Sequence, residues 1–149
     1  FMALWIIAYG FVQATSPRLL RKTHHGHGPD GGTARLWVWL LTLVPAAIAI
    51  ALQQSEATAT VIVVGLVVFG IVFAINSAVH SYLILAYSDH DKVAMNVGFY
   101  YMSNAGGRLA GTVLSGLIYQ QYGIEGCLWL SSIFLLIASL LSAKLPEVK

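Results

Sequence analysis

Long apolar stretches separated by short polar breaks run through this chain of 149 residues. Five stretches are candidate transmembrane helices: 1–16, 36–53, 59–87, 94–120 and 124–143. A helix needs about 20 apolar residues to cross the hydrocarbon core of a bilayer. The period of the stretches is helical, which favours helices over the roughly ten-residue alternating strands of a membrane barrel. The pattern predicts an all-α integral membrane protein built as a bundle of five transmembrane helices.

The composition agrees with a membrane protein. Hydrophobic residues make up 58% of the chain and charged residues only 9%, and the mean hydropathy is +0.76. A soluble domain has about a quarter of its residues charged. The single Cys127 excludes a disulfide within the chain.

Basic residues are confined to one set of polar breaks, apart from Arg108. The predicted loops 17–35 and 88–93 and the C-terminal tail carry Arg18, Arg21, Lys22, Arg35, Lys92, Lys144 and Lys149. The opposite breaks contain no basic residue, and Glu56 and Glu125 are their nearest charges. By the positive-inside rule this predicts a plasma (inner) membrane protein with a cytoplasmic C-terminus. An odd number of spans and an abrupt apolar start lead us to expect the C-terminal part of a larger protein whose N-terminal half is missing.

Arg108 is the residue that constrains function most. It lies near the middle of the stretch 94–120, and every carboxylate of the chain falls in a polar break or, in the case of Glu125, at the very end of a stretch. A cation at the bilayer centre costs roughly 2.5–3.5 kcal/mol on insertion scales, so it faces a cavity or a partner. That partner is either a carboxylate in another part of the molecule or an anionic ligand.

Polar side chains recur at every fourth position around this cation, at Asn96, Tyr100, Asn104, Arg108 and Thr112. Residues four apart lie on one face of a helix. We interpret this line as the wall of a wet cavity and predict that Tyr100, Asn104, Arg108 and Thr112 bind substrate. The competing interpretation is a structural seam, in which Asn and Thr side chains hydrogen-bond between helices.

The preceding stretch adds Asn76 and His80, one helical turn apart. We assign Asn76 to the substrate site and His80 as a candidate proton relay, since histidine gains and loses protons near neutral pH. A neutral hydrogen-bonding role for His80 is an equal alternative. The histidines of the Gly-rich segment 24–28 favour a solvated loop over a metal site, and no cofactor is expected.

An enzyme is not expected, because the sequence shows no carboxylate at membrane depth, no set of metal ligands and no pairing of a nucleophile with a base. Nothing in the sequence indicates a nucleic-acid partner. The predicted partners are the lipid bilayer and a small anionic substrate.

Two motifs carry a resemblance to a known family. Residues 14–22, ATSPRLLRK, occupy the place of a basic cytoplasmic loop motif, and residues 96–109, NVGFYYMSNAGGRL, form a Gly-rich penultimate helix. With short-looped helices around them, the chain resembles the last five spans of a major facilitator superfamily transporter. The acidic residue and the glycine of the loop motif are missing. Residues 76–121 are most similar to the organoarsenical efflux branch.

That resemblance implies an exporter of 1-arseno-3-phosphoglycerate that confers arsenate resistance. It also implies a functional link to a glyceraldehyde-3-phosphate dehydrogenase, which would form this substrate from arsenate. The guanidinium of Arg108 suits such an oxyanion, because it can form two parallel hydrogen bonds with it. The alternatives are a carrier of another organic or sugar-phosphate anion, or a structural membrane subunit in which Arg108 pairs with a partner's carboxylate.

Overall fold

A computed structural model describes residues 2–23, 29, 31–88 and 90–143 of the chain. Within these residues every regular element is helical. The elements are α1 (Met2–Thr23), α2 (Gly31–Gln54), α3 (Thr58–Ala86), the short 3-10 helix η1 (His90–Lys92) and α4 (Val93–Ser142). The predicted all-helical architecture is confirmed for this part of the chain.

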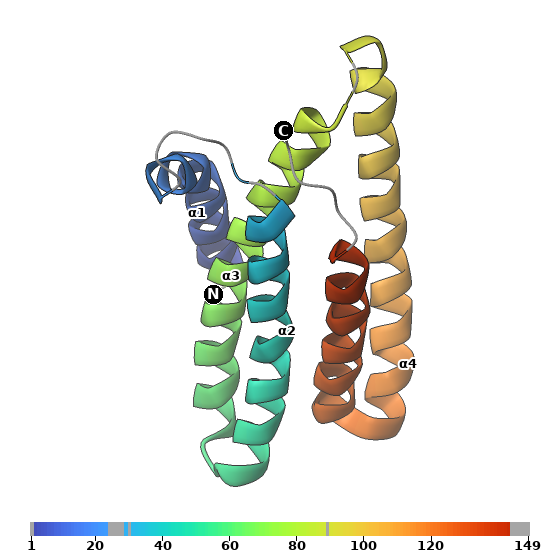
Figure 1. Cartoon of the computed structure of the whole chain (residues 1–149). Helices are drawn as coiled ribbons and strands as arrows, with labels where there is room; N and C mark the ends of the chain where they lie inside the picture. Colours follow the sequence, from blue (N-terminus) through green and yellow to red (C-terminus); the bar gives the residue numbers. More distant parts are fainter. Residues whose placement is uncertain (1, 24–28, 30, 89, 144–149) are drawn as a thin grey trace.

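Helix α4 is a hairpin of two helical arms joined at Gly123 (Figure 1). Gly123 has φ 64° and ψ −159°, a backbone region that is essentially restricted to glycine. We call residues 93–122 the first arm and residues 124–142 the second arm. At 1.5 Å per residue the arms are about 45 Å and about 29 Å long, so each can reach across a bilayer.

In the part of the chain that the structure describes, three helices are long and apolar enough to cross a membrane, namely α2, α3 and α4. The chain therefore has the features of a multi-pass membrane protein. The predicted count of five spans treats the two arms of α4 separately and adds α1, and it stays a prediction.

The helix boundaries differ most from expectation around the predicted loop 17–35. Helix α1 continues beyond Ser16 and Pro17 to Thr23, and α2 begins at Gly31. Leucine, arginine and lysine are good helix formers, and residues 19–22 consist only of these, so the change from apolar to basic residues does not end the helix. The His-rich segment 24–28 lies outside the described residues.

Helix α2 lies at the centre of the bundle, between α3 and the second arm of α4 (Figure 1). Ala34 of α2 packs with Val79 and Leu83 of α3 in a small buried cluster. On the other side, the only buried residues of α4 are Ser132 and Ser139 of the second arm. Small side chains of this kind let membrane helices approach closely.

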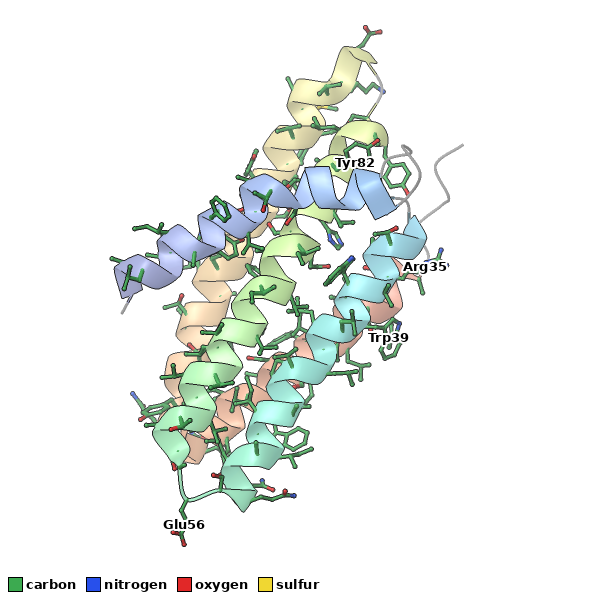
Figure 2. All side chains as sticks on the ribbon, turned by 90° about the vertical axis from the view of Figure 1, so that its left-hand side faces the viewer. Arg35, Trp39, Glu56 and Tyr82 are labelled. Carbon is green, nitrogen blue, oxygen red and sulfur yellow. The ribbon has the colours of Figure 1, made fainter. Side chains whose placement is uncertain are left out.

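Helix α1 packs on α3 at the edge of the bundle and crosses it obliquely (Figure 2). Tyr9 stacks on Phe73, with ring centroids 5.9 Å apart. Arg35 and Glu56 lie at opposite ends of the bundle in Figure 2. The sidedness predicted from the basic residues stays a prediction.

Candidate functional site

The first arm of α4, which carries the predicted anion site, forms the outer edge of the molecule (Figure 1). All its residues from 101 to 117 are exposed. Arg108 lies within this segment, and its neighbour Leu109 is 70% exposed. Among the described residues the Arg108 guanidinium has no hydrogen bond and no ion pair. The isolated membrane cation expected from the sequence is thus also isolated in the described structure.

The polar neighbours of Arg108 differ in how their hydrogen-bonding groups are used. The hydroxyl of Thr112 donates to the carbonyl oxygen of Arg108 at 2.8 Å. The amide of Asn104 is exposed and forms no side-chain hydrogen bond within the described part of the chain. Asn104 therefore has N–H donors available for an anion, whereas the Thr112 hydroxyl would first have to release the backbone carbonyl of Arg108.

Towards the start of the arm, the predicted line of polar residues is half-buried and contacts other side chains. Tyr100 is half-buried, and its ring meets that of Tyr101 edge to face with centroids 5.5 Å apart. Asn96 donates through Nδ2 to the hydroxyl of Ser88 at 3.1 Å. The amide nitrogen of Asn96 is therefore occupied by a contact with the end of α3, which the regular spacing of the line did not reveal.

Asn76 and His80 of α3 form a second polar site. Nδ1 of His80 lies 2.9 Å from the carbonyl oxygen of Asn76. Because a carbonyl can only accept, Nδ1 carries the proton, and Nε2 is the nitrogen left to exchange one. Oδ1 of Asn76 is buried and has no hydrogen-bond partner among the residues that the structure describes.

The structure does not connect these two polar sites. Helix α4 packs mainly against α2 and only slightly against α3, and no hydrogen bond described for Asn76 or His80 reaches the first arm. The prediction that Asn76 and Arg108 act on one substrate is therefore not supported by direct contact, and it remains a prediction.

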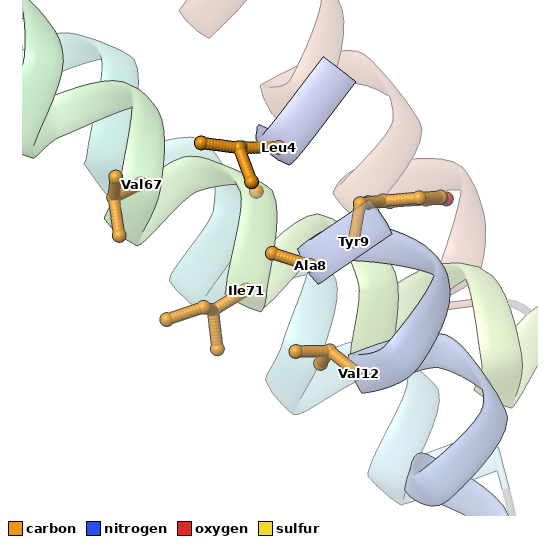
Figure 3. A pocket seen from close by; sticks show the side chains of 7 residues that line it. Leu4, Ala8, Tyr9, Val12, Val67 and Ile71 are labelled. Carbon is orange, nitrogen blue, oxygen red and sulfur yellow. The ribbon is translucent and has the colours of Figure 1, made fainter. Parts of the chain in front are cut away.

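Among the described residues, the pockets between α1 and α3, between α2 and α3, and beside the second arm are lined almost entirely by apolar groups. The first, about 360 Å³, lies between α1 and α3 and is lined by Leu4, Ala8, Tyr9, Val12, Val67, Gly70 and Ile71 (Figure 3). The second lies between α2 and α3, and the third is enclosed by α2, α3 and the second arm. Arg108 lines none of the three, so its proposed cavity would need a wall supplied from elsewhere.

The end of the hairpin at Gly123, which the charge pattern predicts to be the external end, contains contacts that the sequence pattern did not indicate. Sγ of Cys127 donates to the carbonyl oxygen of Ser115 at 3.4 Å and joins the two arms. Gln53 at the end of α2 donates to the carboxylate of Glu125 at 3.2 Å. A search of the described residues for His, Cys, Asp and Glu finds no cluster suited to a metal ion.

Comparison with known proteins identifies the family. Neither the curated proteins nor the solved structures contain a significant match. The family profile described as Major Facilitator Superfamily matches residues 1–148, almost the whole chain. The helical architecture and the apolar helices agree with that match. The chain belongs to the Major Facilitator Superfamily, a family of multi-pass membrane proteins that act as secondary transporters and not as enzymes.

Proposed function

We propose that this chain is the C-terminal part of a secondary transporter that exports an organic oxyanion, and that Arg108 binds the anion. The observation that supports this most is the position of Arg108. It is an exposed cation in the middle of an apolar arm, and among the described residues no carboxylate neutralises it. An anionic substrate would supply the missing charge where the arm meets a cavity.

The chemistry of the arm suits an oxyanion. A guanidinium offers N–H donors in a planar fork that matches phosphate, arsenate or carboxylate. Asn104, one turn away, adds amide donors that are not used within the described residues. Tyr100 and Thr112 complete the binding face, with Thr112 contributing after it releases the Arg108 carbonyl.

The substrate we propose is 1-arseno-3-phosphoglycerate, which carries several oxyanion groups. Its export would confer arsenate resistance, with a glyceraldehyde-3-phosphate dehydrogenase as the source of the compound. This assignment rests on the resemblance of residues 76–121 to the organoarsenical efflux branch. We place the protein in the plasma membrane with its C-terminus in the cytoplasm, because the basic residues gather at that end.

Substitution of Arg108 tests the anion site. Arg108→Lys keeps the charge and loses the planar fork, so uptake of the arsenylated glycerate into everted vesicles should fall while protein abundance is maintained. Arg108→Gln should lower uptake at least about tenfold, because a hydrogen bond to a charged group contributes about 1.5–3 kcal/mol. Lys92→Gln is the matched control, since Lys92 is an exposed cation immediately before the same arm, and it should retain uptake.

The result that contradicts the proposal is normal uptake by a well-expressed Arg108→Gln protein. If Arg108 instead forms a structural ion pair, Arg108→Gln would lower abundance by leaving a buried carboxylate without a partner. Neutralising that carboxylate would then restore abundance. The phosphate analogue of the substrate, measured in parallel, separates a carrier of arsenylated compounds from a carrier of sugar phosphates.

A further inference from the structure

The first arm of α4 is held to the rest of the described structure near its two ends. At the external end, Cys127 bonds to Ser115. A β-carbon on Gly126 would collide with the side chain of Tyr122, so the two arms are closely packed at this end. Between this point and Tyr100 the residues of the arm are exposed, with Ile118 half-buried.

At the opposite end, two consecutive hydrogen bonds connect the arm to the C-terminal end of α3. Nδ2 of Asn96 donates to Oγ of Ser88 at 3.1 Å, and the same Ser88 hydroxyl donates to the carbonyl oxygen of Ile84. Asn96 and Ser88 are both half-buried. The two bonds connect the second turn of α4 to the last turn of α3 across the connection that contains η1.

A movement of the arm at this contact also moves Arg108. Asn96 lies about 40 Å along the helix from Gly123, and Arg108 lies about 22 Å from it, at 1.5 Å per residue. If the arm tilts about its external end, Arg108 moves about half as far as Asn96. A shift of a few ångströms at Asn96 is therefore enough to displace the guanidinium from an anion.

We propose that Ser88 and Asn96 are positioning residues that hold the first arm against α3 and so set the place of Arg108 in the anion site. The role in transport rests on the proposed function of Arg108, whereas the restraint on the arm does not. Loss of either side chain removes this hydrogen bond and leaves the connection through η1 free to change its path, so the arm can tilt about its external end.

Spin-label distances test the restraint without any substrate. Labels replace Leu85 on α3 and Met102 on the arm, which are 55% and 62% exposed, in a transporter carrying Cys127→Ser. The serine hydroxyl can still donate to the Ser115 carbonyl. Ser88→Ala and Asn96→Ala should each broaden and lengthen the distance distribution, and the double variant should add little to either. Ser88→Thr should keep the parent distribution.

Ser131→Ala is the matched control, because the Ser131 hydroxyl bonds only to the carbonyl of Cys127 in its own arm. It should leave the distance unchanged. An unchanged distribution in both alanine variants would overturn the proposal. If one alanine variant does not accumulate in the membrane, the other provides the same test from the opposite side of the bond.

Transport kinetics supply the second readout. Loss of a hydrogen bond of about 1 kcal/mol corresponds to about a fivefold effect, so KM for the arsenylated glycerate should rise about fivefold in Ser88→Ala. The Ser88→Thr variant should restore KM. A parent protein that moves no oxyanion would refute the proposed function, while the distance measurement would still decide the restraint. A changed distance with an unchanged KM would refute the positioning role alone.

Discussion

The side chain of Ile48 on α2 occupies the space that a β-carbon on Gly65 of α3 would need. That atom would lie 2.6 Å from Cγ1 and 2.7 Å from Cδ1 of Ile48. Real β-carbons do not approach other atoms so closely, so the contact between α2 and α3 depends on the absence of a side chain at Gly65.

Gly65→Ala should therefore destabilise the protein by about 1–3 kcal/mol, the usual cost of overpacking a core. The double variant Gly65→Ala/Ile48→Ala should be more stable than the two single effects added together, because each change relieves the other. Thermal unfolding in detergent measures this. Gly98→Ala is the control, since nothing lies within 4 Å of the added atom. Equal stability of Gly65→Ala and Gly98→Ala would contradict the contact.

The hairpin of α4 depends on the backbone of Gly123. Its φ of 64° combined with ψ of −159° lies outside the left-handed helical region that asparagine tolerates. Gly123→Ala and Gly123→Asn should therefore destabilise equally, by about 1–3 kcal/mol. Gly116→Ala, also with open space around the added atom, serves as the control in the same unfolding assay. A clear advantage of Asn over Ala at position 123 would show that the turn has a different backbone geometry.

A substitution of Asn76 can distinguish a role in stability from a role in substrate binding. Its Oδ1 is buried without a partner, and replacing an unsatisfied polar group by an apolar one of similar size is close to neutral or stabilising. Asn76→Leu should keep or raise the melting temperature. If Asn76 binds substrate, the same variant should lose uptake. Full uptake by a stable Asn76→Leu protein would remove Asn76 from the substrate site.

His80 is the candidate proton relay. With Nδ1 bonded to the Asn76 carbonyl, only Nε2 is left to take up a proton. His80→Gln should flatten the dependence of transport on pH and leave substrate binding nearly intact. The measurement is uptake across a pH series together with substrate affinity at one pH. Transport by His80→Gln that keeps the parent pH profile would assign His80 to a structural polar seam.

Part of the candidate site was predictable from the sequence because it depends on a single helix. The spacing of Asn104, Arg108 and Thr112 places them on one helical face whatever surrounds it, and the absence of carboxylates from the middle of the apolar stretches isolates Arg108. The contacts of Asn96 were not predictable. Its position on the same line suggested a cavity wall, and only the return of the chain through η1 brings it to Ser88.

The sequence by itself determined which segments are helical and which are apolar, because both properties follow from local hydrogen bonding and from the period of hydrophobic residues. It was less informative about where helices end. Residues 17–23 looked like a loop because they are polar, yet good helix formers continue α1 to Thr23. Only the tertiary structure decided that α2 is central, that Gly65 admits Ile48, and that the first arm of α4 is left exposed beside the bundle. These relationships depend on the meeting of surfaces distant in sequence, and one apolar helix face fits many partners until close packing selects among them.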